Sequence, residues 1–187
     1  MFWPARTSSQ SEVLTWRGLV TYYVLFFIHL ESRRVSIAGI TDHPDACWMR
    51  QVACNATFEG MGHLNGCRYL LHDRDAKFCP QFRETLAAGG VQCLRLPPRS
   101  PNLNAFAEPW GRSVKEECLS HLILFGQASL RKALTQFQQH YHAERNHQGK
   151  NNVLLFPAPA PLEPGPRRGI HCRERLGGLL RYYSRAA

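Results

Sequence analysis

A run of aromatic and β-branched residues near the start of the chain limits the fold more than any other feature. The run is "GLVTYYVLFFIHL", residues 18–30, and "RVSIAGI" follows it after the polar segment "ESR". Two such runs joined by a short polar turn predict a β-hairpin, with Glu31 to Arg33 as the turn. The first run is too short to span a bilayer and contains Thr21 and His29. The sequence therefore predicts a β-sheet in the core and no membrane segment.

Helical and strand patterns alternate along the rest of the chain. Helices are predicted after an Asp42 cap, from Pro80 to Ala88, and over about residues 105–120 and 129–144. The short apolar runs "CRYLLH" and "VQCLRL" are typical of buried strands. The order strand, strand, helix, strand, helix, strand, loop, helix, helix predicts an α/β domain with a mixed sheet flanked by helices.

Composition divides the chain into three segments. Residues 1–12 contain Pro, Thr, three Ser and Gln and are predicted to be irregular. Residues 13–155 hold the predicted helices and strands. Residues 156–187 begin with the proline-rich "FPAPAPLEPGP" and continue into an arginine-rich end. Because proline-rich segments act as linkers, we expect one domain followed by a linker and a basic tail.

The charge balance favours a polyanionic partner. The chain of 187 residues has 23 Lys and Arg against 14 Asp and Glu, which gives a formal net charge of +9. Lysine and arginine that bind phosphates release counterions, so nucleic acid is a natural partner for such a chain. Charge alone leaves open the alternative of a basic protein without a nucleic-acid role.

The seven cysteines are scattered along the chain, and none is spaced as C-x-x-C. Zinc sites and disulfide frameworks usually show tighter grouping. We therefore expect buried, reduced thiols in a cytoplasmic protein.

The segment "YLLHDRDAKF" places Asp73 directly after a predicted strand. Ligands of α/β sheets bind beyond the carboxyl ends of strands. Mg²⁺ takes one or two carboxylates as ligands, and water and substrate phosphate complete its shell. Asp73 is therefore a candidate metal ligand. In the alternative interpretation, Asp73 and Asp75 only cap a turn.

A second acid, Glu108, lies 35 positions after Asp73, beyond the proline-rich loop "PPRSPNLN". Asn104 is placed to cap the next helix, with Glu108 one turn in. Arg112 and Lys115 follow at i+4 and i+7 from Glu108, and therefore lie on the same helical face. This face offers a metal ligand next to two phosphate-binding cations. The alternative is an ordinary Glu–Arg pair on a solvated helix.

Four features in order resemble the integrase core domain, the catalytic domain of retroviral integrases and many insertion-sequence transposases. They are "HDRDAKF", "SPNLNAFAE", the Lys115 spacing and "YHAERNHQG", and the resemblance covers about residues 13–155. It implies a ribonuclease H-like fold and metal-dependent DNA strand transfer, the reaction of DNA integration by a mobile element. It also implies Mg²⁺ or Mn²⁺ as cofactor, DNA as partner, and a homo-oligomer on DNA.

The resemblance also implies roles for particular residues. Asp73 matches the second of the family's three metal-binding acids and Glu108 matches the third, so both are expected to be catalytic and metal-binding. Lys115 matches a lysine that approaches DNA in relatives. Asn104 and Arg112, from the same segment, are expected to join it as DNA-binding residues.

Other positions depart from the family pattern or match it less clearly. Asp75 falls where the family has Gly, so no role is carried over to it. Pro109 follows Glu108 where close relatives carry Arg; proline costs about 3 kcal/mol inside a helix and far less in its first turn. Arg145 and His147 match a further element, for which a structural role is the alternative to DNA contact.

The family's first acid has no match in this sequence. Its expected position falls near Thr7, and the region before the apolar run contains no Asp and only Glu12 as an acid. A neutral side chain cannot bridge two cations, and both reach and strand alternation disfavour Glu12 as a substitute. We therefore expect an incomplete first strand, left by a truncated or decayed coding sequence.

Three functions are compatible with these features. The first is a polynucleotidyl transferase core of the integrase or transposase type, impaired because the first Asp is absent. The second is a non-catalytic DNA-binding remnant of a mobile element. The third is a metal-independent interaction module whose acids only cap turns. Metal binding separates the first two from the third, and strand transfer separates the first from the second.

Overall fold

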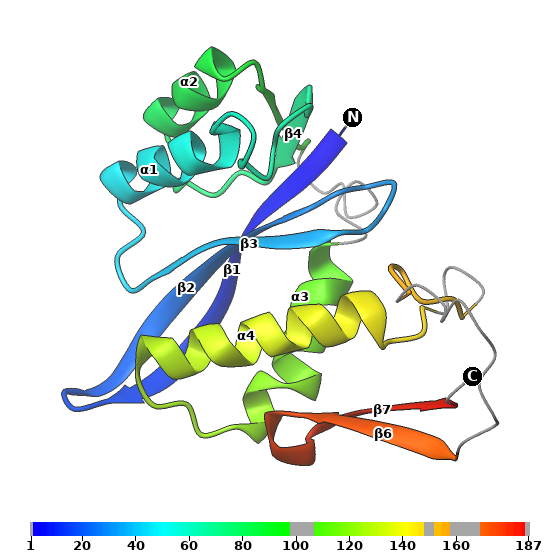
Figure 1. Ribbon diagram of the computed structural model, residues 1–187. Coiled ribbons are helices and arrows are strands. Elements are labelled where there is room, and N and C mark those ends of the chain that lie inside the picture. The colour runs from blue at the N-terminus through cyan, green and yellow to red at the C-terminus, as the bar shows by residue number, and fades with distance from the viewer. Residues whose placement is uncertain (1, 98–106, 148–151, 158–168, 186–187) are drawn as a thin grey trace.

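A computed structural model describes residues 2–97, 107–147, 152–157 and 169–185 (Figure 1). A mixed sheet lies between two pairs of helices, and a separate two-stranded hairpin lies beside the last helix. The principal elements follow one another as β1, β2, β3, α1, β4, α2, β5, α3, α4, β6 and β7. The predicted α/β class, with a mixed sheet flanked by helices, is confirmed.

The central sheet has five strands in the order β3-β2-β1-β4-β5. Strands β1 (Phe2–Thr15), β2 (Gly18–Ile28) and β3 (Val35–Thr41) form an antiparallel meander. Strand β4 (Tyr69–His72) pairs in parallel with β1, and β5 (Gln92–Arg95) pairs in parallel with β4. Helical crossovers before β4 and β5 supply the long connections that parallel pairing requires.

Strand β1 differs most from the sequence-based prediction, which treated residues 1–12 as irregular and the first strand as incomplete. It extends from Phe2 to Thr15 and has a neighbour on each side: Ala5 pairs with Phe27 of β2 and with His72 of β4. Serine-rich segments have low strand propensity, but a strand between two neighbours is held by backbone hydrogen bonds, which every residue type except proline can donate. The polar amino end therefore forms the middle strand of the sheet.

Strand β2 separates two hydrophobic cores, because successive side chains of a strand point to opposite faces. Phe26 and Ile28 belong to the core that α3 (Ala107–Glu117) and α4 (Gly126–Ala143) cover. Leu25 and Phe27 belong to the core that α1 (Ala46–Thr57) and α2 (Pro80–Ala88) cover. Because both faces are covered, the run "LFFI" is apolar without alternation.

Two helix starts differ from the prediction. Helix α1 begins at Ala46, because Asp45 rather than Asp42 is its cap and accepts a hydrogen bond from the N–H of Trp48 at 2.7 Å. Helix α4 begins at Gly126, which is earlier than residue 129. Helix α2 has the predicted bounds. Apart from Pro97, the "PPRSPNLN" loop lies outside the described residues, and so does the Asn104 cap.

The arginine-rich end of the chain forms a hairpin rather than the predicted tail. Strands β6 (Ile170–Arg175) and β7 (Leu180–Arg185) pair antiparallel, and Gly177 and Gly178 in the turn have φ of 67° and 90°. Leu180 is 6% exposed and joins the core on the α4 side of the sheet. Leu176, in the turn, packs against the same core. Two apolar residues among many arginines are too weak a pattern to predict a packed hairpin. Most of the predicted proline-rich linker lies outside the described residues.

All seven cysteines are free thiols, but only Cys67 and Cys118 are buried. Burial raises the pKa of the Cys118 thiol to about 11, which makes it a poor nucleophile. Cys47, Cys54 and Cys172 are exposed, so the expected burial applies to part of the set. Among the described helices, none is both long and apolar enough to cross a membrane.

Candidate metal and nucleic-acid site

Asp73 is the first residue after β4, which lies between β1 and β5. Its Oδ1 accepts a hydrogen bond from the N–H of Asp75 at 3.0 Å. The preceding His72 is 1% exposed, and its Nδ1 lies 2.7 Å from the Asp73 carbonyl oxygen. Burial lowers the pKa of His72, so the neutral ring donates its Nδ1 proton to that carbonyl. A buried ring and a tight turn thus fix the backbone that carries the Asp73 carboxylate.

Asp75 has a different set of contacts. Its Oδ1 accepts a hydrogen bond from the N–H of Lys77 at 3.0 Å, and its Oδ2 lies 2.9 Å from the Lys77 Nζ. The same ammonium group lies 5.0 Å from the centre of the Tyr23 ring on β2. These contacts connect Asp75 to the turn and, through Lys77, to β2 of the central sheet. Asp75 therefore has a structural role.

Glu108 lies in the first turn of α3, on the same helix as Arg112 and Lys115. The buried side of this helix fixes its place on the sheet: Trp110 is 1% exposed, and its ring centroid lies 4.2 Å from that of Phe26. Pro109 also falls in the first turn, where backbone N–H groups have no partner within the helix. The proline therefore costs little at this position.

Lys115 lines a groove of about 420 Å³ between α3 and the β1–β2 hairpin, and Glu12 and Thr21 line the same groove. Arg112 and Lys115 are both exposed. Glu12 pairs with Thr21, seven residues beyond Ala5 in β1, or roughly 23 Å further along the strand. Glu12 is therefore near Lys115 and far from the β4 end of the sheet, where Asp73 lies.

The register between β1 and β4 identifies the residues beside Asp73. The last pair in this register is Ala5 with His72. The next residues of β1 are Arg6 and Thr7, and the next residue after β4 is Asp73. Neither Arg6 nor Thr7 is an acid. Within the described residues, no three His, Cys, Asp or Glu side chains gather as a group that could hold a metal ion.

Arg145 and His147 make structural contacts. Arg145 forms an ion pair with Glu117, which connects the end of α4 to the end of α3. His147 is 7% exposed, its Nε2 lies 2.8 Å from the Tyr141 carbonyl oxygen, and the two rings meet edge to face. These contacts favour the structural interpretation of the "YHAERNHQG" segment.

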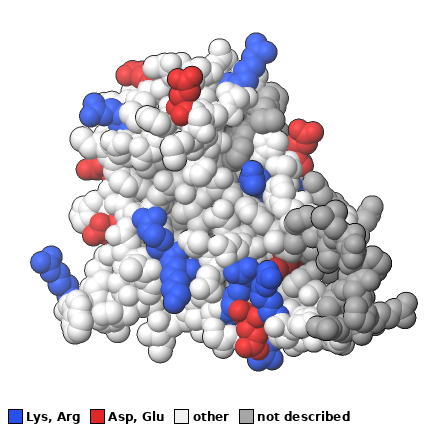
Figure 2. Space-filling view, in the orientation of Figure 1, with Lys and Arg blue, Asp and Glu red and all other residues white. Residues whose placement is uncertain are grey.

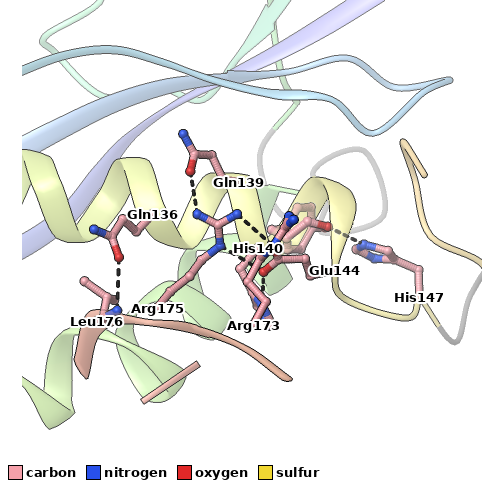
Figure 3. Close-up of polar contacts among 9 residues, drawn as sticks. Gln136, Gln139, His140, Glu144, His147, Arg173, Arg175 and Leu176 are labelled. Atoms are coloured by element: carbon pink, nitrogen blue, oxygen red, sulfur yellow. Dashed lines mark hydrogen bonds and ion pairs between the residues drawn. The ribbon is translucent and has the colours of Figure 1, made fainter. Parts of the chain in front are cut away.

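The sequence-based predictions missed a buried acid with several charged partners, Glu144 at the end of α4 (Figure 3). Its side chain is 1% exposed. Arg175 of β6 donates to both carboxylate oxygens, at 2.9 and 2.7 Å, and Arg173 and His140 reach the same carboxylate at 3.4 and 3.1 Å. The only signal in the sequence is an acid within "HAERNH" and an arginine-rich segment far along the chain.

Opposing effects set the charge state of this cluster. Burial alone would raise the pKa of Glu144, but hydrogen bonds from Arg175 and His140 outweigh it and lower the pKa to about 2. Hydrogen bonding to Glu144 also raises the pKa of Arg175. Glu144 and Arg175 are therefore a charged pair at neutral pH, and they attach the β6–β7 hairpin to α4.

Comparison with known proteins finds a family match for part of the chain. The family model described as "Integrase core domain" matches residues 89–153, which include Glu108 and Lys115 but not Asp73. A search of curated proteins finds no match.

Solved structures of integrases share the fold at low sequence identity. A chain of the simian T-cell lymphotropic virus intasome in complex with PP2A regulatory subunit B56 gamma aligns with a TM-score of 0.58 and 13% identity, over 98% of this chain and 66% of that one. The catalytic core domain of BIV integrase aligns with a TM-score of 0.55 and 12% identity, over 82% and 90%. The HTLV-2 integrase catalytic core domain, solved in complex with magnesium, aligns with 0.56 and 11%, over 81% and 91%.

The structural likeness covers more of the chain than the family match does. The family model describes α3, α4 and the segments around them, and the solved structures extend the likeness to the sheet that carries Asp73. Residues 89–153 thus match the integrase core domain family, and the chain has the ribonuclease H-like fold of retroviral integrase catalytic cores.

Proposed function

We propose that this protein is a DNA-binding core of the integrase or transposase type whose strand-transfer activity is impaired. The observation that carries the proposal is the β1–β4 register, which leaves Arg6 and Thr7 beside Asp73. Strand transfer by two metal ions needs carboxylates that hold both ions and neutralise their charge. Arg6 carries a positive charge and Thr7 a neutral hydroxyl, so neither replaces the missing acid. The acids that remain as candidate metal ligands are Asp73 and Glu108.

The donor chemistry fits one divalent ion rather than two. Asp73 and Glu108 are hard oxygen ligands, and Mg²⁺ is commonly held by one or two carboxylates together with water and substrate phosphate. When bound, such an ion would activate water or a DNA 3′-hydroxyl for attack on a phosphodiester. Arg112 and Lys115 then position the DNA through its phosphates. The HTLV-2 core solved in complex with magnesium supports the choice of a divalent ion as cofactor.

DNA and a second copy of the chain are the proposed partners. The net charge of +9 supports a polyanion, and the similarity to a chain of an intasome supports DNA in particular. The HTLV-2 core is solved in a trimeric and a dimeric form, which supports a homo-oligomer. Asn104 is proposed as a further DNA contact from the segment before α3.

Restoring an acid in β1 tests the proposal. Strand transfer of a labelled DNA end is measured with Mg²⁺ and with Mn²⁺ for the unchanged protein, Arg6→Asp, Thr7→Asp and the control Gln10→Asp. We expect little or no transfer by the unchanged protein and at least a hundredfold gain in one of the first two variants. Gln10 is exposed and further along β1, so its substitution should give no gain.

Two results would contradict the proposal. Full activity in the unchanged protein would show that no further acid is required. Inactivity of all variants, with DNA binding intact, would favour the second candidate, a non-catalytic DNA-binding remnant. The observation that favours this candidate is that no three metal-binding side chains gather among the described residues.

A further inference from the structure

The outer face of α4 forms one wall of a groove of about 740 Å³ that lies apart from the candidate metal site. Six lining residues recur at helical spacing and so lie on one face of the helix: Ala128, Arg131, Lys132, Thr135, Gln136 and Gln139. The opposite face carries Leu130, Ala133, Leu134 and Phe137, which are buried in the core. Helix α4 is thus anchored on one side and presents a polar stripe on the other.

The other wall of the groove is β6, and polar contacts hold it in place (Figure 3). Arg175 donates to the Gln139 Oε1 at 2.6 Å as well as to Glu144, and the N–H of Leu176 donates to the Gln136 Oε1 at 3.0 Å. Because both glutamines use their carbonyl oxygens in these bonds, their amide nitrogens point away from the hairpin. The walls are therefore preformed, and the glutamines present hydrogen-bond donors.

The charges of the groove favour an anion. Arg131 and Lys132 are exposed, and neither forms an ion pair with any acid in the described part of the chain. The acid in the lining, Glu174, lies 3.1 Å from Arg181, and Arg175 is balanced by Glu144. Figure 2 shows basic side chains over the middle of α4 and beside the hairpin. The two unbalanced charges are therefore positive.

We propose that this groove binds the phosphate backbone of one DNA strand, as a second DNA-binding surface. From Ala128 to Gln139 the stripe is about 16 Å long, enough for about five nucleotides at 3.4 Å each. Two cations, two amides and the Thr135 hydroxyl are donors suited to phosphate oxygens. The inference rests on the proposed function only in its choice of DNA as the polyanion.

The test compares two double variants that remove the same charge. Arg131→Ala with Lys132→Ala removes the groove cations, and Arg50→Ala with Arg68→Ala removes two exposed arginines from α1 and from the segment before β4. Binding of a labelled DNA duplex is measured by fluorescence anisotropy across a salt series. We expect the groove variant to lose roughly fivefold to tenfold in affinity and to flatten the log–log salt slope by about 1.8, or 0.9 per phosphate contact. The control variant, Arg50→Ala with Arg68→Ala, should change the affinity and the salt slope much less.

A third arm, Lys115→Ala, separates this inference from the proposed function. If Lys115→Ala weakens binding and the groove variant behaves like its control, the groove proposal is wrong and the DNA-binding core stands. If the unchanged protein does not bind the duplex at all, the proposed function fails as well. Unchanged circular dichroism and melting temperature establish that each variant is folded.

Discussion

Glu144 and Asp73 are acids in opposite circumstances. Glu144 is buried at the end of α4, where two arginines and a histidine surround its carboxylate. Asp73 lies half-buried at the end of β4, where its carboxylate accepts a backbone N–H from a turn. Glu144 holds the β6–β7 hairpin against α4. Asp73 lies at the carboxyl end of a parallel strand, which is where α/β sheets bind ligands.

The contrast shows why strong bonding is a poor guide to function here. A carboxylate whose oxygens are all bonded to arginine and histidine has no room for a metal ion, and its charge is used in holding the fold. A carboxylate on a rigid turn at a strand end keeps part of its surface accessible. We therefore expect Glu144 to matter for stability and Asp73 for ion binding.

The largest expected effect is the loss of stability in Glu144→Ala. The change leaves Arg175, whose side chain is 18% exposed, without its partner, and breaking a buried ion pair in this way costs about 3–5 kcal/mol. Urea denaturation measures the change in the free energy of unfolding. The matched control is Glu174→Ala, because that side chain is 51% exposed and pairs with the exposed Arg181. The control should cost less than about 1 kcal/mol, and equal losses would show that Glu144 has no special role.

Acid pH should weaken the same attachment. The pKa of Glu144 is about 2 in the folded chain against an ordinary 4.5, so the unfolded chain binds its proton first as the pH falls. This contribution to stability is fully present above pH 4.5 and is lost progressively down to about pH 2. It amounts to about 3 kcal/mol, at 1.36 kcal/mol for each unit of pKa difference.

Protonation of His142 causes a separate loss of stability at higher pH. Burial lowers its pKa from 6.5 to about 4, and its Nε2 accepts the N–H of Val35 at 2.9 Å. The unfolded chain therefore gains this proton between pH 6.5 and 4, which also destabilises the fold. Unfolding free energies measured from pH 7 to 2 should fall over both windows. Glu144→Gln should flatten the curve only below pH 4.5; a curve that keeps its full slope there would contradict the assignment.

The sequence predicted regions with strong side-chain patterns. The run "LFFI" in β2 and the helix Pro80–Ala88 are set by hydrophobic periodicity and by local signals, and both were correct. Strand β1 could not be predicted, because its stabilising bonds are to the backbones of β2 and β4 and leave no mark on its own serines. The absence of an acid near Thr7 was visible in the sequence, but the residues beside Asp73 could be identified only from the register.

The hairpin Ile170–Arg185 shows the same limit in another form. Its bonds to α4 join Arg175 to Glu144 and Leu176 to Gln136, which are residues more than thirty positions apart. No periodicity connects such partners, so an arginine-rich composition was interpreted as a tail. The candidate metal ligands Asp73 and Glu108 came from local motifs, and their joint role stays a prediction.

The smallest expected effect on stability, and the sharpest test of the division, comes from Asp73→Asn against Asp75→Asn. Both variants remove one negative charge from the same turn. Asparagine at position 73 can still accept the Asp75 N–H, so stability should change by less than about 0.5 kcal/mol. Asparagine at position 75 loses the ion pair to Lys77 and should cost about 1 kcal/mol.

Titration with Mn²⁺, followed by paramagnetic broadening of nearby resonances, should show at least a tenfold weaker affinity in Asp73→Asn only. Equal affinities in the two variants would mean that the ion responds to the overall charge of the turn, and Asp73 would then be a capping residue like its neighbour.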